Sequence, residues 1–388
     1  MHRYIDEPAE LLESARDLEG APRVFLDTEF ESRKNRCELC LLQVSRGDQV
    51  YVIDALRLGE LSPLGTALDP SRTQWVVHAG RQDVSLVMEA LGATLKPRVF
   101  DTQVAWGLLS AESSVSLAYL EYRLLGRRPH KSRQADNWQR RPLDRVQLTY
   151  AASDVELLPA LVEHLEARLD EYGRTDLVFS ASRDQLWPQP SAPMPLGLET
   201  FRNAWQLDSQ SQAVLLALVD WYNSLDRASH RGGPDPRSLL SVAAHLPQTP
   251  KQLRAIKGIP KRWGAQFAHT MVEIVSTALR HSDAHQYVQL TPPSYKTFDS
   301  YRLDAWLQMM RAEVCAELVV APDLVLPGRL LSRIGDALRK RVQPVPGLQG
   351  WRAELLNEPI ARYIRHHPPP CTPVVRGAQS GAPAQADH

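Results

Sequence analysis

The chain has 388 residues, of which 43% are hydrophobic and 23% are charged, and its net charge at pH 7 is zero. The composition is typical of a soluble globular protein, and the length suits two or three domains. No apolar run reaches the roughly 18 residues that a membrane span needs. Residues 1–19 are acidic and amphipathic, unlike a signal peptide. We therefore expect a cytoplasmic monomer with no membrane partner.

The first 185 residues alternate between strand and helix patterns. An α/β domain with a mixed sheet and helices on its faces is the predicted fold of this part. Residues 46–49 predict a hairpin-type turn between two of the strands. Strands are expected at residues 23–30, 38–45, 49–54, 75–79 and 98–101, and helices at about 82–91, 102–110, 116–125 and 143–170.

Four prolines within residues 186–199 exclude a helix or a central strand there. We interpret residues 186–204 as a linker between domains. Beyond the linker the pattern is helical, and it repeats weakly: residues 236–241 are echoed by residues 327–332. Trp263 is echoed in the same way by Trp351.

Two all-α modules of similar length therefore follow the linker. The first module is expected at residues 205–290 and the second at residues 291–366. Residues 367–388 are rich in Pro, Ala and Gln, and we expect them to be disordered.

Cys37 and Cys40 form a C-x-x-C motif, which is compatible with a zinc or redox site. Zinc requires four ligands, and the other cysteines, Cys315 and Cys371, lie far away in the sequence. The motif also falls within an expected buried strand. We interpret both residues as reduced core thiols.

Positive charge is concentrated in two segments although the total charge is zero. Residues 123–145 contain eight Lys or Arg, and residues 249–263 contain five with no acidic residue. Such segments favour contacts with phosphates and, through Trp138, with bases, whereas the alternative is an ordinary solvated basic face. The candidate RNA-binding residues are Lys131, Arg133, Trp138, Arg140, Arg141, Lys257, Lys261 and Arg262.

Asp27 and Glu29 are two positions apart in an expected strand, so their side chains leave the same face. Two buried carboxylates on one face require a compensating cation. Mg²⁺, which prefers oxygen ligands, would supply it. A strand end paired with Arg or Lys is the alternative.

Further acidic residues follow along the chain. Asp83 comes just after the strand at 75–79 and suits the first turn of a helix, from which it can also face a metal. His78 is more consistent with a packed strand residue than with a ligand. Tyr150 and Asp154 are four residues apart and share one helix face, with small residues between them.

The order and spacing of these residues resemble the three motifs of the DEDDy exonucleases, which have a ribonuclease H-like fold. Phe25-Leu26-Asp27-Thr28-Glu29-Phe30, Phe100-Asp101-Thr102-Gln103 and the segment from Asn137 to Leu143 are similar to ribonuclease D. The two helical modules resemble the HRDC domains of that family, the second in degenerate form. The resemblance covers about residues 1–366.

The resemblance implies a 3′→5′ exoribonuclease that uses two divalent metal ions, Mg²⁺ or Mn²⁺, around the scissile phosphate. Asp27 would bind both ions, and Glu29 and Asp154 the ion that activates water. Asp83 would act through water on the second ion, and Tyr150 would orient the attacking water. Precursor tRNA with a 3′ trailer would be the substrate, and 5′-nucleoside monophosphates the products.

Three alternatives remain open from the residues. A DEDDy exonuclease could act on single-stranded DNA or on both nucleic acids, because no residue identifies the 2′-hydroxyl. A catalytically idle RNA-binding adaptor would keep the fold and lose the chemistry. A zinc or redox protein would use Cys37 and Cys40.

Overall fold

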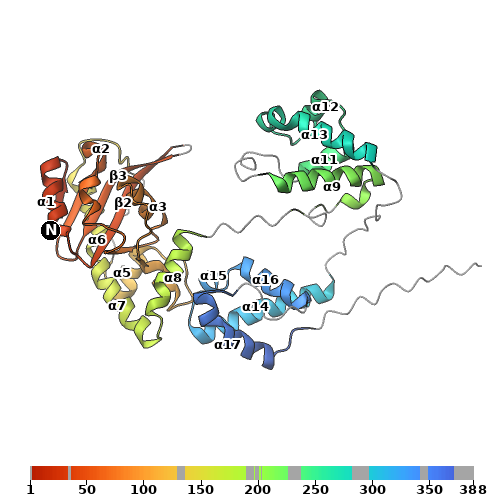
Figure 1. The fold of residues 1–388 in the computed structure, drawn as a ribbon. Helices are drawn as coiled ribbons and strands as arrows, with labels where there is room; N and C mark the ends of the chain where they lie inside the picture. Colours follow the sequence, from red (N-terminus) through yellow and green to blue (C-terminus); the bar gives the residue numbers. More distant parts are fainter. Residues whose placement is uncertain are drawn as a thin grey trace, which may run out of the picture. The chain divides into compact units, whose positions relative to one another are not determined.

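The computed structural model describes residues 2–33, 36–128, 136–188, 196, 201, 203–225, 237–281, 297–340 and 348–370. The chain forms two compact units, drawn in Figure 1. Unit 1 combines Met1–Gln189 with Phe298–His388, and unit 2 is Pro190–Thr297. The second helical module therefore shares a unit with the α/β domain, whereas the first module lies in the other unit. None of the described helices has the length and apolar character that crossing a bilayer requires.

A six-stranded sheet organises the α/β part of unit 1, with the order β1-β4-β3-β2-β5-β6. β3 pairs antiparallel with both β2 and β4, whereas β1–β4, β2–β5 and β5–β6 are parallel pairs. The predicted mixed sheet is therefore confirmed. The strands are β1 (His2–Ile5), β2 (Arg23–Arg33), β3 (Arg36–Ser45), β4 (Val50–Asp54), β5 (Gln74–Val77) and β6 (Val99–Asp101).

β1 is the strand that the sequence pattern did not predict. It has four residues, and of these only Ile5 is buried. So short an edge strand contains too few positions for an alternating pattern to be recognised. It is stabilised by its parallel partner β4.

Helices cover both faces of the sheet.

The predicted single helix at 143–170 is wrong, because α6 ends at Glu156 and α7 begins at Leu158. Pro159 in the first turn of α7 explains the break, since proline has no N–H and its ring clashes with the preceding turn. The helices are α1 (Pro8–Leu18), α2 (Ala55–Leu58), α3 (Arg81–Ala90), α4 (Thr102–Gly107), α5 (Leu117–Leu125), α6 (Arg145–Glu156), α7 (Leu158–Glu171) and α8 (Thr175–Leu186).

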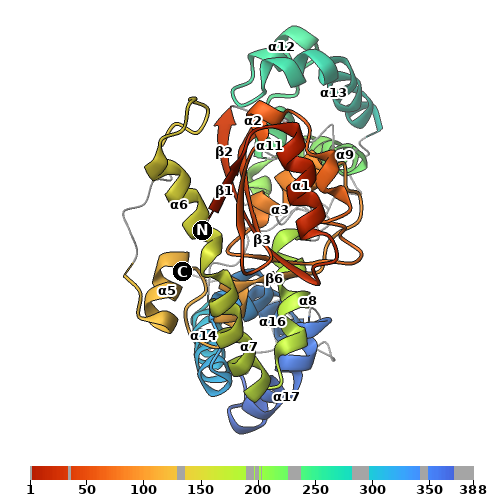
Figure 2. The ribbon, with the colours of Figure 1, turned by 90° about the vertical axis from the view of Figure 1, so that its left-hand side faces the viewer.

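Two hydrophobic cores lie on opposite faces of the sheet, as the alternation along the strands requires. Phe25 and Val76 face the core that contains α4, α6 and α7. Val24 and Leu26 face the other core, which contains α1 and α3. Figure 2 shows α1 and α3 on one side of the sheet and α5 and α6 on the other.

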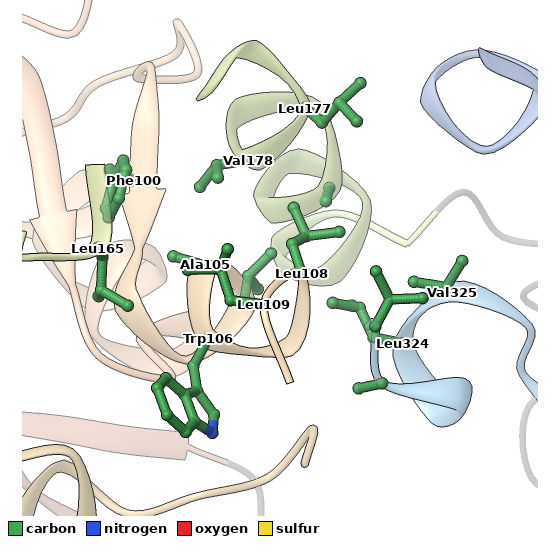
Figure 3. Close-up of a cluster of buried hydrophobic side chains, with 14 of the residues drawn as sticks. Phe100, Ala105, Trp106, Leu108, Leu109, Leu165, Leu177, Val178, Leu324 and Val325 are labelled. Atoms are coloured by element: carbon green, nitrogen blue, oxygen red, sulfur yellow. The ribbon is translucent and has the colours of Figure 1, made fainter. Parts of the chain in front are cut away.

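The second helical module packs against α4 and α8. It consists of α14 (Phe298–Leu318), α15 (Pro322–Val325), α16 (Gly328–Lys340) and α17 (Trp351–His366). The N–H of Ala321 donates to the carbonyl of Gly107 at 2.7 Å. A Cβ on Gly107 would lie 2.8 Å from Leu324, so glycine permits this close approach. Figure 3 shows Leu324 and Val325 beside Leu108 within one apolar cluster.

A buried arginine completes this contact. Arg174 is 6% exposed and donates to the carbonyls of Leu108 and Leu318 at 2.7 and 2.6 Å. Both carbonyls lie at helix C-termini, where backbone oxygens lack partners and attract cations. Asp184 of α8 in turn accepts hydrogen bonds from Trp351 and Arg352 of α17. The second module is thereby bound to the α/β domain by polar as well as apolar contacts.

Unit 2 contains the first helical module and has a core of its own. The sequence repeat matches helix starts in the two modules: α11 and α16 begin at Arg237 and Gly328, and α13 and α17 at Lys261 and Trp351. The helices of unit 2 are α9 (Ser209–Ser224), α11 (Arg237–His245), α12 (Pro250–Ala255) and α13 (Lys261–His281).

Candidate active site

Asp27 and Glu29 of β2 face the side of the sheet that α6 covers. They continue the alternation that places Phe25 in the same core. Glu29 is only 8% exposed, although it carries a carboxylate. The pairing of β2 with β3 shifts register between Glu29 and Phe30, so a local irregularity lies next to the acidic pair. Such irregularities often redirect a side chain at a functional site.

Asp83 approaches from the first turn of α3. Its carboxylate accepts a hydrogen bond from the hydroxyl of Thr28, which lies between the two acidic residues of β2. The turn before α3 depends on Gly80, because a Cβ there would lie 2.5 Å from the Cβ of Val77. The carboxylate of Asp101 accepts from the N–H groups of Ala79 and Gly80 at 3.0 and 3.1 Å. These contacts fix the start of α3 and so the position of Asp83.

Tyr150 and Asp154 lie one turn apart on α6. Ala151 and Ala152 between them are buried, and they let the helix lie close to the sheet. A capping box at Asp144 begins the helix. The Tyr150 hydroxyl forms a hydrogen bond with the Asp154 carboxylate, which keeps the pKa of Asp154 from rising further.

These five side chains line one pocket of about 480 Å³. The pocket thus brings together all of the predicted catalytic residues, from β2, α3 and α6. In the described part of the chain, no lysine or arginine lines it. Its other lining residues are Leu26, Thr28, Phe30, His78, Ala79, Gln103, Val115, Ser116, Leu117 and Leu158.

The acids of the pocket repel one another, and no lysine or arginine among its described lining residues offsets their charge. Burial, and then repulsion from Asp83, Asp154 and Glu29, raise the pKa of Asp27 well above its ordinary value. Burial, followed by the same kind of repulsion, raises the pKa of Glu29 to about 9.

The pKa values of the other two acids, Asp154 and Asp83, are raised as well. The pKa of Asp154 is raised to about 7 by burial and by Glu121. Burial also raises the pKa of Asp83, although the Thr28 hydroxyl opposes the shift. Mutual repulsion of this kind is relieved when a cation binds.

The donor set suits hard divalent cations, since it consists of carboxylate oxygens. Among the described residues, no three acidic, histidine or cysteine side chains form a ready-made metal cage.

His78 lies in the wall of the pocket but not among the acids. Its ring nitrogens contact the Thr102 hydroxyl at 2.9 Å and the Val115 carbonyl at 3.0 Å. Burial lowers its pKa, which favours the neutral ring. Gln103 also donates to the Val115 carbonyl, at 2.7 Å. The two side chains hold the loop that forms one wall of the pocket.

The structure corrects two of the candidate RNA-binding residues. Trp138 is 1% exposed and stacks on Tyr150 with ring centroids 6.3 Å apart, so it has no free face for a base. Arg141 forms an ion pair with the buried Asp54 and is a structural cation. Positive charge in a sequence does not reveal such pairing in advance.

The remaining candidates are exposed or lie outside the described residues. Arg140, Lys257 and Lys261 are exposed. Lys131, Arg133 and the side chain of Arg262 lie outside the described residues.

Three supporting residues of the site were not predicted: Thr28, Asp101 and Gln103. Asp101 ends β6 and caps α4, a position at which aspartate is common and which the sequence could have indicated. Thr28 and Gln103 lie in segments similar to ribonuclease D, but no local pattern identifies their contacts with Asp83 and Val115.

The fold and the acidic pocket define a 3′→5′ exonuclease. Residues 2–170 match the family model described as 3′-5′ exonuclease. Ribonuclease D from Gluconacetobacter diazotrophicus is 31% identical over 367 residues, covering 90% of this chain and 91% of the relative. Ribonuclease D from Nitrobacter hamburgensis is 29% identical, covering 93% and 94%.

Among solved structures, Escherichia coli RNase D has the same fold, with a TM-score of 0.62 and 22% identity over 95% of this chain and 100% of that one. The chain belongs to the ribonuclease D family. It is a metal-dependent 3′→5′ exoribonuclease with a ribonuclease H-like exonuclease fold. The idle-adaptor alternative and the zinc or redox alternative are thereby excluded as its principal function.

Proposed function

We propose that this exoribonuclease trims the 3′ trailers of precursor tRNA and of other structured RNAs, releasing 5′-nucleoside monophosphates. The observation that carries the proposal is the convergence of four carboxylates and Tyr150 in one pocket without Lys or Arg among its described lining residues. Support for structured RNA as the substrate comes from E. coli RNase D, described as an exoribonuclease involved in structured RNA processing.

In this proposal Asp27, Glu29, Asp83 and Asp154 hold two divalent ions, Mg²⁺ or Mn²⁺. Two such ions supply a nucleophilic water and stabilise the leaving 3′ oxygen. Tyr150 positions the water from the side of α6, with its hydroxyl bonded to Asp154. Its ring is held from behind by Trp138. Tyr150 need not act as the base, because an unperturbed tyrosine has a pKa of about 10.

The size of the pocket supports action at a chain end. A volume of about 480 Å³ accommodates a ligand of nucleotide size. Val115, Ser116 and Leu117 line the same pocket as the acids of β2 and α6, and are available to contact the terminal nucleoside.

The first helical module is proposed to hold the body of the RNA as an HRDC-like domain. Lys257 and Lys261 are exposed on either side of the turn at Gly258, which has a φ of 98° that favours glycine. Ser238 of α11 donates to the carbonyl of Gly258 at 3.1 Å and fixes the turn. Exposed cations on a fixed turn suit phosphate contacts. Most of the segment of the second module that corresponds to this turn lies outside the described residues.

The direct test is a time course with a 5′-labelled tRNA that carries a 3′ extension, in Mg²⁺ and in EDTA. We expect stepwise shortening in Mg²⁺ that stops near the mature 3′ end, and none in EDTA or with Asp27→Asn. Asp176→Asn, at an exposed position, is the matched control.

Oligomers of RNA and DNA with the same sequence test the sugar preference. Faster degradation of DNA, or shortening that continues into the tRNA body, would contradict the proposed substrate.

A further inference from the structure

The catalytic pocket offers no cationic side chain to its substrate among its described lining residues. Metal ions can neutralise the phosphate that is cleaved, but an RNA chain carries a further phosphate at each nucleotide. Those phosphates lie beside the pocket and require positive charge or hydrogen-bond donors of their own. The surface next to the pocket is therefore where a substrate contact is needed.

A second pocket of about 230 Å³ adjoins the first, and both include Ala79 and Gln103 in their walls. Its walls come from the α/β domain and from α15 of the second helical module, all within unit 1. Besides Gln103, its polar lining residues are Arg81, Asp101, Ser113, Ser114, Gln185 and Asp323.

Both carboxylates of this second pocket have partners of their own. Asp101 accepts from the backbone N–H groups of Ala79, Gly80 and Gln103. Asp323 forms an ion pair with Arg311. Arg81 is exposed and makes no ion pair with any described residue. Its guanidinium is thus the cation that this pocket leaves available.

Arg81 also has a fixed relation to the catalytic acids. It is in the first turn of α3, two residues before Asp83. The start of this helix is held by Asp101 and by the close packing of Gly80 on Val77. A phosphate bound by Arg81 would therefore be held in a defined position relative to the cleavage site.

We propose that this second pocket, the Arg81 pocket, binds a backbone phosphate of the RNA next to the one that is cleaved. The guanidinium of Arg81 is its ligand, and the hydroxyls of Ser113 and Ser114 are available as further donors. This inference rests on the proposed function and specifies a substrate contact for it. It also gives the second helical module a part in substrate binding, because Asp323 and Leu324 of α15 line the pocket.

The test measures the affinity of the full-length protein for a labelled RNA hexamer in EDTA, where the RNA stays intact. Arg81→Gln is expected to weaken binding about tenfold, as for a lost hydrogen bond between charged groups. The dependence of log affinity on log salt should fall by about 0.7, the value for one phosphate of a single strand. Arg81→Lys should recover most of the affinity. Arg16→Gln, exposed on α1 and outside both pockets, should bind like the wild type.

A second measurement separates binding from damage to the catalytic site. With Mg²⁺, Arg81→Gln should lower kcat/KM more for the hexamer than for a dinucleotide, whose single phosphodiester occupies the catalytic pocket. Unchanged hexamer affinity, or an equal loss on both substrates, would overturn the proposal, since the latter indicates a displaced Asp83. If the wild type releases no nucleotide from the hexamer, the proposed function itself fails, independently of the Arg81 result.

Discussion

Asp54 and Asp27 are acids on strands of the same sheet, but their pKa values are shifted in opposite directions. Asp54 ends β4 and is 0% exposed. It accepts hydrogen bonds from Arg141, from the Tyr4 hydroxyl and from the N–H of Arg57. Burial alone would raise its pKa, but these bonds outweigh burial, and its pKa lies below the ordinary value.

Burial, and then repulsion from Asp83, Asp154 and Glu29, raise the pKa of Asp27, and no lysine or arginine among the described residues lines its pocket. The difference separates a structural carboxylate from one that we propose to be catalytic. Asp54 has an arginine as its partner and a lowered pKa, whereas the acids of the pocket have one another as charged neighbours and raised pKa values.

The largest effect on stability is expected when the Asp54 pair is broken. Arg141→Met leaves a buried carboxylate without its cation and removes the hydrogen bond to the Trp138 carbonyl. The free energy of unfolding should fall by about 3–5 kcal/mol. Denaturant unfolding measures it, with Arg140→Met at the neighbouring exposed position as the control. If Arg141→Met is as stable as Arg140→Met, the structural role of the pair is wrong.

A smaller effect on stability is expected from Trp138→Phe. The indole is buried against Tyr150, and its N–H has no hydrogen-bond partner among the described residues, so phenylalanine loses volume but none of the described polar contacts. We expect a loss of about 1–2 kcal/mol in stability.

The catalytic consequence should appear in kcat more than in KM, because Trp138 is buried and stacks on Tyr150. Steady-state kinetics on a short RNA measure it. A rise in KM with unchanged kcat would instead indicate that Trp138 binds the substrate.

The ion-free protein should lose stability as pH rises. Glu29 has a pKa of about 9 in the fold against an ordinary value of 4.5. Its contribution to stability is therefore complete below about pH 4.5 and is lost as pH rises through 9. Asp154, with a pKa of about 7, acts in the same direction.

Thermal melts in EDTA between pH 6 and pH 9 measure this loss. We expect the Tm to fall by more than about 3 °C, which corresponds to about 1 kcal/mol in a domain of this size. Saturating Mg²⁺ should remove the trend. A Tm that rises with pH in EDTA would show that the acids are already compensated.

The smallest effect is expected for a substitution in unit 2, and it concerns the affinity for tRNA. Lys257→Ala removes one exposed cation from a turn that is otherwise unchanged, so affinity for tRNA should fall only about threefold and become less dependent on salt. Binding titrations at several salt concentrations measure it, with Lys251→Ala, exposed on the same module, as the comparison. A loss equal to that of Lys251→Ala would show that the turn has no special role.

Local periodicity predicts which acidic residues share a face of a strand or helix. It does not predict which elements tertiary contacts bring together. The spacing of Asp27 and Glu29 on a strand, and of Tyr150 and Asp154 on a helix, determines which side chains share a face. The place of Asp83 in the same site required the family resemblance, because nothing local brings α3 to β2.

Arg141 was assigned to RNA because a sequence shows its charge but not its distant partner, Asp54. The contact of Gly107 with Ala321 likewise joins positions far apart in sequence, so the packing of the second module on α4 left no local pattern. The break between α6 and α7 was predictable, since Pro159 indicates it.

The most direct test of the account is the Tm of the wild type and of Asp27→Asn, each with and without Mg²⁺, at pH 8. Removing one of four mutually repelling acids should raise the Tm in EDTA and abolish most of the stabilisation by Mg²⁺, while Asp176→Asn behaves like the wild type. An Asp27→Asn protein that melts lower in EDTA, yet gains as much from Mg²⁺ as the wild type, would contradict a shared metal site.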